Sequence, residues 1–245
     1  MNIKFSLVLP CYNEEKNIKH LYSEFEKLPK KNENVELIFV NNGSYDSTET
    51  EIDDVIKKNE VNGISNIKVR KINLEKNQNY SGGVITGLNS AKGEFIGWSH
   101  ADLQTPLEDF YKLYNKIMNQ KDVLGKGYRV NRGGLDNIIT KLHEICASII
   151  LGYRMKEINA APKIFHRNLL QIFSNMPTSS TLLDTYIVYI CKLKNITITE
   201  INVEFKKRIY GESKWKNNIR NLIKHLFINF YYILKLRFSN DNNKT

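Results

Sequence analysis

Residues 3–14 read Ile-Lys-Phe-Ser-Leu-Val-Leu-Pro-Cys-Tyr-Asn-Glu, a largely apolar run that ends at Pro10 and continues into a polar loop. A short apolar run that is stopped by a proline predicts a buried β-strand over residues 3–9. Strands of this kind are typical of parallel sheets covered by helices, and such sheets bind ligands at the carboxyl ends of their strands. The loop at residues 10–14 is therefore the first candidate for a functional segment.

Apolar runs and helical patterns alternate through the rest of the chain. Asn13 is a candidate cap for the first helix, and Pro29 would end it. Further strands are predicted at residues 35–40, 67–72, 94–98, 122–126, 163–166 and 196–205. The clearest helices are predicted at residues 79–91, 107–118, 135–151, 182–193 and 215–238. The pattern predicts an α/β fold with a mainly parallel central sheet flanked by helices.

The chain has 245 residues and a formal net charge of +10, and most of the excess charge lies near its end. Residues 203–245 hold 10 basic and 3 acidic side chains, against 26 and 23 in the rest of the chain. Such an excess favours an anionic partner, which can be nucleic acid, a phosphorylated substrate or a lipid surface. The three cysteines form no Cys-x-x-Cys pair, and no apolar run reaches the ~18 residues of a membrane span. We therefore expect a cytoplasmic protein without an integral anchor.

Four polar segments stand where chemistry is expected in such a fold. Three of them follow the first, second and fourth predicted strands, whose carboxyl ends share one edge of the sheet. They read Pro-Cys-Tyr-Asn-Glu at 10–14, Asn-Asn-Gly-Ser-Tyr-Asp-Ser-Thr at 41–48 and Ser-His-Ala-Asp-Leu-Gln-Thr-Pro at 99–106. The fourth, Arg-Ile-Tyr-Gly-Glu-Ser-Lys at 208–214, follows the last predicted strand.

Taken in this order, the four segments resemble the signature of family-2 glycosyltransferases with the GT-A fold. They are most similar to the dolichol- and polyprenyl-phosphate sugar synthase branch, and the resemblance covers residues 3–214. It implies a GT-A catalytic domain over residues 1–214 and a basic amphipathic C-terminal helix and tail over residues 215–245. It also implies that a nucleotide-diphosphate sugar binds at the strand ends.

The first two segments would bind the nucleoside of this donor. Pro10, Tyr12 and Glu14 match the opening motif that lines the nucleoside pocket in the family. Asn42 stands where many members carry an aspartate that accepts a hydrogen bond from the base. Because an amide both donates and accepts, the choice between UDP- and GDP-sugars stays open. Asp46 matches the downstream aspartate of the motif and is equally suited to cap the following helix.

His100-Ala101-Asp102 occupies the Asp-x-Asp position of the family. A leaving diphosphate needs its developing charge neutralised, commonly by Mg²⁺ or Mn²⁺ held through carboxylates. The resemblance makes Asp102 the main metal ligand and catalytic candidate, with Ala101 beside the sugar nucleotide. His100 replaces the first aspartate, and an imidazole suits Mn²⁺ better than Mg²⁺. His100 is therefore either a second metal ligand or a hydrogen-bond donor to the sugar nucleotide.

Asn79 opens a segment with Gly82, Gly83 and Gly87 that is similar to the Asn/Gly segment before the fourth strand in the family. The glycines either let the backbone approach the nucleotide sugar or permit close packing of a helix on the sheet. Both interpretations stay open at this point.

Basic side chains are the candidates for binding phosphate groups. Arg208, Ser213 and Lys214 lie in the segment that folds over the diphosphate in the family, and a guanidinium fits phosphate oxygens. Arg129 follows the fifth predicted strand, where related enzymes place groups near the acceptor phosphate. Arg132 is either a second such group or a solvated side chain.

Asp184 is the candidate catalytic base, because relatives place an acceptor-side acid at about this position. It is equally explained as an acidic residue at the start of a helix. A lipid phosphate acceptor is already ionised and needs no base, whereas a sugar hydroxyl must lose a proton.

Apolar and aromatic residues repeat at helical spacing through residues 219–238, with lysines and arginines between them. Such a helix suits the interface of an anionic bilayer. The alternative is a helix packed on the catalytic domain or on a second subunit. The membrane interpretation predicts a protein bound peripherally to the cytoplasmic face, and a homo-oligomer stays open.

The sequence thus predicts a metal-dependent, inverting glycosyltransferase. It would move a sugar from a UDP- or GDP-sugar to a polyprenyl phosphate or to a lipid-linked, cell-surface glycan. Because His100 replaces a carboxylate, a catalytically silent glycosyltransferase-like subunit is the alternative. Nucleic-acid binding would explain the charge alone, but the basic residues match no nucleic-acid motif, so no nucleic-acid partner is expected.

Overall fold

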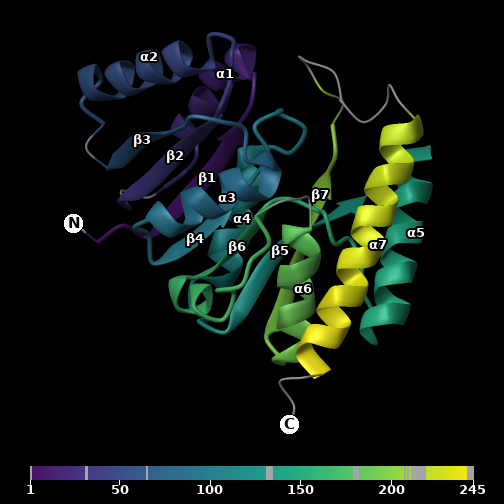
Figure 1. Cartoon of the computed structure of the whole chain (residues 1–245). Helices are drawn as coiled ribbons and strands as arrows, with labels where there is room; N and C mark the ends of the chain where they lie inside the picture. The colour runs from purple at the N-terminus through teal and green to yellow at the C-terminus, as the bar shows by residue number, and fades with distance from the viewer. Residues whose placement is uncertain are drawn as a thin grey trace.

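The computed structural model describes residues 2–30, 33–64, 66–130, 135–178, 182–206, 208, 210 and 219–241. Its centre is a seven-stranded sheet in the order β3-β2-β1-β4-β6-β5-β7 (Figure 1). The strands are β1 (Phe5–Cys11), β2 (Val35–Asn42), β3 (Ile67–Leu74), β4 (Phe95–Trp98), β5 (Val123–Val130), β6 (Lys163–His166) and β7 (Thr197–Glu204). All neighbouring pairs are parallel except those of β6, which is antiparallel to both β4 and β5. The predicted mainly parallel sheet is confirmed.

Seven α-helices and one short 3-10 helix in the described residues cover this sheet. They are α1 (Glu15–Glu26), α2 (Thr48–Val61), α3 (Asn79–Ser90), α4 (Leu107–Ile117), α5 (Leu135–Leu151), η1 (Arg167–Leu170), α6 (Leu183–Leu193) and α7 (Ile219–Asp241). Helices α1, α2 and α4 pack on one face, and α3, α5, α6 and α7 contribute to the core on the other.

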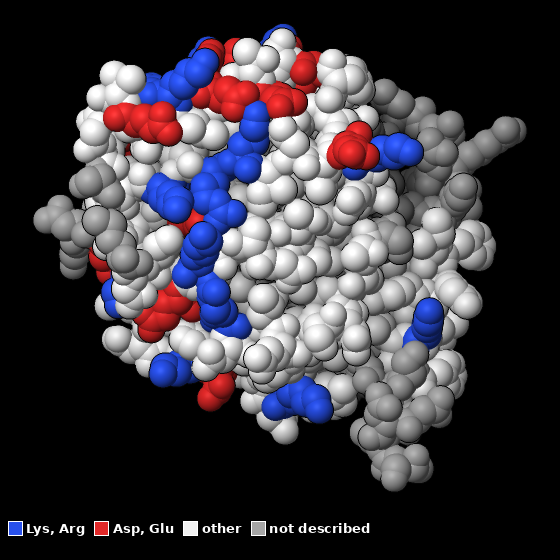
Figure 2. All heavy atoms as spheres, turned by 60° about the vertical axis from the view of Figure 1, so that its left-hand side comes forward, with Lys and Arg blue, Asp and Glu red and all other residues white. Residues whose placement is uncertain are grey.

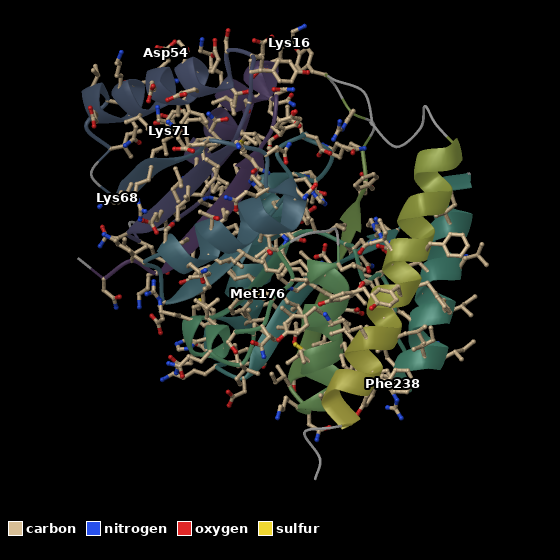
Figure 3. All side chains as sticks on the ribbon, viewed as in Figure 1. Lys16, Asp54, Lys68, Lys71, Met176 and Phe238 are labelled. Atoms are coloured by element: carbon tan, nitrogen blue, oxygen red, sulfur yellow. The ribbon has the colours of Figure 1, made fainter. Side chains whose placement is uncertain are left out.

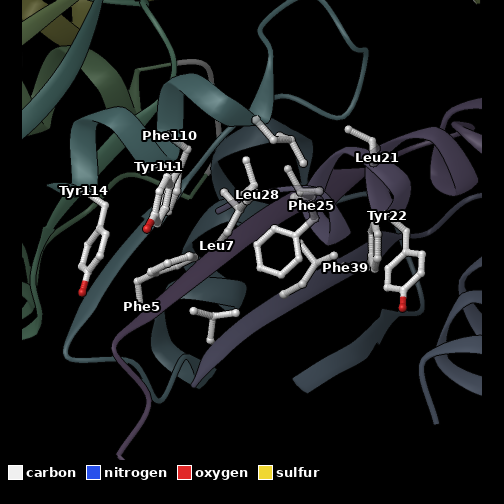
Figure 4. Close-up of a cluster of buried hydrophobic side chains, with 14 of the residues drawn as sticks. Phe5, Leu7, Leu21, Tyr22, Phe25, Leu28, Phe39, Phe110, Tyr111 and Tyr114 are labelled. Atoms are coloured by element: carbon white, nitrogen blue, oxygen red, sulfur yellow. The ribbon is translucent and has the colours of Figure 1, made fainter. Parts of the chain in front are cut away.

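Strand β1 shows why both faces are buried. Successive side chains of a strand point to opposite faces, so Leu7 and Leu9 enter the first core while Val8 enters the second. The first core is rich in aromatic rings from α1 and α4, which gather around Phe5 (Figure 4). A largely apolar central strand that is buried on both faces requires a layer of helices on each side, as residues 3–9 predicted.

Strand β5 is longer than predicted, because it continues through Arg129 to Val130 instead of ending near residue 126. The sequence pattern ended the strand too early because it contains Gly125, Lys126 and Gly127, and glycine and lysine are both depleted in strands. Lys126 is nevertheless buried, and its ammonium pairs with Glu200 of the neighbouring strand β7 at 2.8 Å. The prediction that Arg129 follows the fifth strand was therefore wrong, and Arg129 is part of β5.

The start of α1 also differs from the prediction. The residue preceding this helix is Glu14, which makes no side-chain capping bond, so Asn13 is not its cap. Asn13 instead accepts a hydrogen bond from the Tyr45 backbone NH at 3.0 Å and has a positive φ of 57°. The side chain that was expected to start a helix therefore joins two loops.

Edge strand β3 carries basic side chains that fall within the face shown in Figure 2, where blue side chains form a band below a red cluster. Two of these basic side chains are paired with carboxylates, one buried and the other at the surface. Arg70 pairs with the buried Glu36 at 2.7 Å, and Lys71 pairs with Glu49 and Asp53 of α2. Lysines on an edge strand also discourage pairing with a further strand.

The C-terminal helix α7 packs beside α5, and its Ile233 and Leu236 are buried in the second core (Figure 1). The sequence left two interpretations of the tail open, a membrane-binding helix and a helix packed on the rest of the protein. The second holds for one side of α7. No helix in the described part of the chain is both long and apolar enough to cross a membrane.

Candidate active site

The loops after β1 and β2 are joined by hydrogen bonds at the carboxyl edge of the sheet. The Asn13 NH donates to Ser44 Oγ at 3.0 Å, and the Glu14 NH donates to Thr48 Oγ1 at 2.8 Å. Asp46 accepts from the Thr48 NH at 3.0 Å and from the Glu15 NH at 3.3 Å. Asp46 therefore bonds the first residue of both α1 and α2, which supports its interpretation as a helix-capping group.

Asn42 holds the start of helix α3. Its Nδ2 donates to the Asn79 carbonyl at 2.8 Å, and its Oδ1 accepts from the Gln78 NH at 2.9 Å. A Cβ on Gly83 would lie 3.1 Å from Pro10 Cβ and 3.2 Å from Asn42 Nδ2, so these residues are in close contact. The structure thus brings Pro10, Asn42 and Asn79 together, with the amide of Asn42 bonded to backbone groups.

Asp102 is buried in the middle of the loop after β4, and both of its carboxylate oxygens accept hydrogen bonds. Its Oδ1 accepts from the Gln104 NH at 3.1 Å. Its Oδ2 accepts from Arg208 Nε at 3.2 Å and from Arg208 Nη2 at 3.0 Å. The next residue, Leu103, has a φ of 59°, a conformation that costs energy for a residue with a branched side chain. The hydrogen bonds to both oxygens orient the Asp102 carboxylate.

Glu14 lies near the same group of charges. Burial raises its pKa from 4.5 to about 7, and Asp102 and Asp46 act in the same direction. A hydrogen bond from Asn17 and the charge of Arg208 oppose this rise in pKa. Glu14 is therefore a carboxyl group that titrates close to neutral pH.

His100 is held against Tyr80, with ring centroids 5.3 Å apart. Burial lowers the pKa of His100, and the charges of Lys163 and Arg129 contribute to the decrease, while Asp102 and Asp184 oppose it. The imidazole is accordingly neutral at pH 7, which is the form that can bind a metal ion. Ala101, between His100 and Asp102, is buried at 4% exposure.

A network of buried ion pairs lies behind His100. Lys163 donates to Asp184 Oδ1 at 2.5 Å, and Arg129 Nε donates to Glu157 at 2.6 Å. Burial lowers the pKa of Lys163 to about 8, against the opposing charge of Asp184. The Nη2 atom of Arg129 is buried and has no hydrogen-bond partner among the described residues.

Asp184 is thus both an acidic residue in the first turn of α6 and one half of a buried ion pair. Sequence analysis did not identify Lys163 as its partner. The sequence did contain a sign of this pair, since Lys163 lies in the predicted strand Lys-Ile-Phe-His at 163–166. A lysine buried in a strand requires a charged or polar partner.

The described residues after β7 contact the loop after β4 and helix α1. The Lys206 NH donates to the Gln104 carbonyl at 2.9 Å, and Gln104 Nε2 donates to the Lys206 carbonyl at 3.0 Å. Tyr210 stacks on His20 of α1, with ring centroids 5.9 Å apart and ring planes at 23°. The predicted phosphate-binding residues Ser213 and Lys214, and also Arg132, lie outside the described residues.

Tyr12, a predicted nucleoside-binding residue, lies in the loop after β1. Its ring packs edge-on against the ring of Tyr45, with ring centroids 6.1 Å apart.

The carboxylate of Asp102 and the imidazole of His100 have the chemistry to hold a cation that a phosphorylated ligand also binds. Within the described residues, no three His, Cys, Asp or Glu side chains converge on one point as a metal cage. Mg²⁺ and Mn²⁺ commonly take only one or two protein ligands and complete their coordination with phosphate oxygens and water. The Arg208 guanidinium already places positive charge against Asp102 Oδ2. The carboxylate therefore faces a position that suits a cation.

The fold is the GT-A fold, with the candidate site at the carboxyl edge of its parallel strands. The profile described as "Glycosyl transferase family 2" matches residues 6–186, and the chain belongs to this family. It is 25% identical to an uncharacterized glycosyltransferase of Synechocystis sp. over 88% of this chain and 65% of that protein. It is 31% identical to the dolichol-phosphate mannosyltransferase of Saccharomyces cerevisiae over 52% of this chain and 46% of that protein.

Solved structures share the same fold. The mannosyltransferase PcManGT from Pyrobaculum calidifontis, solved with GDP-Man and Mn²⁺, matches with a TM-score of 0.67 and 16% identity. This match covers 96% of the present chain and 65% of PcManGT. Further relatives are undecaprenyl-phosphate sugar transferases of Aeromonas hydrophila and Proteus mirabilis, as expected for the polyprenyl-phosphate branch. The chain spans about half to two thirds of the length of these curated relatives.

Proposed function

We propose that this chain is a glycosyltransferase that moves a sugar from a UDP- or GDP-sugar to a polyprenyl phosphate or a lipid-linked glycan, with inversion and with a divalent cation. One observation carries the proposal. Asp102 and Arg208, which are 106 residues apart, meet at the carboxyl edge of the sheet. A carboxylate for a cation and a guanidinium for a diphosphate are the two groups that a nucleotide-sugar donor requires.

The donor would lie across the loops after β1, β2 and β4. In this proposal the nucleoside contacts the first two loops, the sugar lies near His100, and the diphosphate meets the segment after β7. The residues assigned to the nucleotide sugar are Pro10, Tyr12, Glu14, Asn42, Asp46, Asn79, His100 and Ala101. The residues assigned to the diphosphate are Arg208, Ser213 and Lys214.

Asp102 and His100 would hold Mg²⁺ or Mn²⁺. When bound, the cation neutralises charge that develops on the leaving diphosphate. Asp102 is directed by its bond from the Gln104 NH, and His100 is neutral and therefore able to donate a lone pair. Inversion by direct displacement requires no covalent intermediate on the protein.

The acceptor would lie toward Arg129 and Asp184. The buried Nη2 of Arg129, which has no hydrogen-bond partner in the described part of the chain, supports an anionic acceptor, since guanidinium groups fit phosphate oxygens. A lipid phosphate needs no base. If the acceptor is a sugar hydroxyl, Asp184 is the candidate base, and its carboxylate is already paired with Lys163.

A lipid-linked acceptor requires contact with a membrane surface, and we propose that helices α5 and α7 provide it. Both helices expose apolar side chains on the side away from the core, and Figure 3 shows Phe238 of α7 projecting outward. The exposed residues are Leu142, Ile145 and Ile149 on α5 and Phe227, Phe230, Tyr231 and Phe238 on α7. Helix α7 has four basic residues and one acidic residue in sequence, which favours an anionic bilayer as the occupant.

Asp102→Ala tests the proposed activity. We expect turnover to be abolished while the fold is kept, because Arg208 is partly exposed and can be solvated when its partner is removed. The measurement is release of UDP or GDP from nucleotide sugars in the presence of polyprenyl phosphate and Mn²⁺, with the melting temperature followed in parallel. Asp122→Ala removes an exposed carboxylate and is the matched control. An active, metal-independent Asp102→Ala protein would exclude this assignment.

A catalytically silent binding subunit is the second candidate, favoured by the neutral His100 in place of a carboxylate. Such a protein would bind a nucleotide sugar with Mn²⁺ and release no nucleoside diphosphate. Binding and turnover assays on the same preparation separate the two candidates.

A further inference from the structure

Arg208 is bound to the carboxylate of Asp102, which the proposed function assigns to a divalent cation. Both Nε and Nη2 of Arg208 bind the same oxygen, Asp102 Oδ2, at 3.2 and 3.0 Å. The Asp102 side chain is 10% exposed and the Arg208 side chain 30% exposed, so the pair is shielded from water on the aspartate side. A cation that approaches Oδ2 therefore meets a guanidinium already in place.

The position of Arg208 does not depend on this ion pair alone. Two hydrogen bonds join Lys206 to Gln104, beside Asp102, and Tyr210 stacks on His20 of α1. Lys206, Arg208 and Tyr210, which we call the strap, thus contact the loop after β4 at one end and α1 at the other. The contacts on either side of Arg208 hold its guanidinium over the site.

The charges explain why Arg208 is stable in this position. Arg208 forms an ion pair with Asp102 and interacts electrostatically with Glu14, and Asp46 adds negative charge near Glu14. In the absence of a divalent cation, Arg208 supplies the positive charge that this group of carboxylates requires. A cation bound at Asp102 would repel Arg208, whose guanidinium would then need another anion as its partner.

We infer that Arg208 is the resident counter-ion of Asp102 and exchanges partners when the donor binds. The divalent cation takes Asp102, and Arg208 moves from Asp102 to the phosphate oxygens of the nucleoside diphosphate. Each ligand then binds weakly alone, because it must separate the Arg208–Asp102 pair without replacing both partners. This inference rests on the proposed function, and it makes the cation and the diphosphate bind with positive coupling.

The test is a binding experiment that does not depend on turnover. Binding of Mn²⁺ to the full chain is measured by the electron paramagnetic resonance signal of the free ion, at constant ionic strength. Mn²⁺ affinity is measured for the wild type and for Arg208→Gln, first without nucleotide and then with UDP or GDP. We expect Arg208→Gln to bind Mn²⁺ alone about tenfold more tightly, and the gain in Mn²⁺ affinity on adding the diphosphate to fall by a similar factor.

A reciprocal variant tests the other partner. Asp102→Asn releases Arg208, so the inference expects UDP or GDP to bind more tightly to this variant than to the wild type when no metal is present. Isothermal titration calorimetry in the presence of a chelator measures this affinity. An unchanged or weaker affinity for both nucleoside diphosphates would overturn the exchange of partners.

Lys206→Gln is the matched control, because it removes one positive charge from the same strap without removing a contact to Asp102. Its affinity for Mn²⁺ should stay within about twofold of the wild type. An equal gain in Lys206→Gln and Arg208→Gln would attribute the effect to net charge and overturn the inference. An Arg208→Gln protein that binds Mn²⁺ alone as the wild type does, with the same gain on adding diphosphate, would overturn the inference while leaving the proposed function in place. A wild type that binds neither Mn²⁺ nor any UDP- or GDP-compound would overturn both.

Discussion

Glu14 is the residue through which pH acts on this site. Its folded-state pKa is about 7, above the ordinary 4.5, so between these values the folded protein holds a proton that the unfolded chain has released. The free energy of unfolding therefore falls as pH rises from about 4.5 to about 7. The cause is first the burial of the carboxyl group and then its neighbours Asp102 and Asp46.

Glu14→Gln should reduce this pH dependence. Gln keeps an oxygen for the bond from Asn17 and has no charge to bury. The decrease in unfolding free energy between pH 5 and pH 8 should be smaller in the variant by about 1–2 kcal/mol. Urea denaturation at the two pH values measures the difference. Glu75→Gln, at an exposed position, serves as the control, and equal pH dependence in Glu14→Gln and wild type would contradict the expectation.

Asp184→Asn separates a structural from a catalytic role of this residue. The substitution leaves Lys163 buried without its charged partner, so the protein should lose about 3 kcal/mol of unfolding free energy. Adding Lys163→Met should restore part of the loss, because the unpaired ammonium is then removed. Urea denaturation of the single and double variants measures both effects. Unchanged stability with loss of turnover would instead support Asp184 as a base.

At the scale of elements, α3 shows how glycines determine the approach of a helix to the sheet. A Cβ on Gly87 would lie 2.2 Å from Val8 Cγ1 and 3.1 Å from Val40 Cγ2. Gly87 therefore permits close packing of α3 on β1 and β2, whereas Gly83 lies beside Pro10 and Asn42 at the site. Close packing on the sheet is thus confirmed for Gly87, whereas an approach of the backbone to the nucleotide sugar stays a prediction.

Gly87→Ala should lower the unfolding free energy by about 2 kcal/mol, since the overlap with Val8 outweighs the gain in helix propensity. Asn89→Ala, on the exposed side of α3, gains propensity without overlap and should not destabilise the protein. Denaturation curves of the two variants provide the comparison. Val8→Ala combined with Gly87→Ala should recover stability if the overlap is the cause.

At the scale of the whole molecule, α7 has apolar residues on two sides. One side is buried in the second core, and the other is exposed together with the outer side of α5. Exposed apolar patches of this kind mark interaction surfaces. The basic residues of α7 favour an anionic membrane over a second copy of the same basic helix.

Ile149→Ser combined with Phe238→Ser should weaken binding to phosphatidylglycerol vesicles by about tenfold or more, because both side chains are largely exposed. Co-sedimentation with the vesicles measures the change. Val61→Ser, at the end of α2 on the other side of the sheet, is the control. Loss of a dimer in the double variant, with vesicle binding unaffected, would assign the surface to a second copy.

The sequence by itself determined the layers of the fold and predicted where the candidate site lies. Apolar runs such as residues 3–9 have no exposed face, so a sheet covered on both sides follows from local pattern alone, and the polar loops after β1, β2 and β4 must meet at one edge. The tertiary structure decided the partners of charged residues. The contacts of Asp102 with Arg208, of Asp184 with Lys163 and of Lys126 with Glu200 join residues distant in sequence, and no local periodicity encodes them. For the same reason, only the folded chain shows that β5 continues through buried charges and that α7 buries one side while exposing the other.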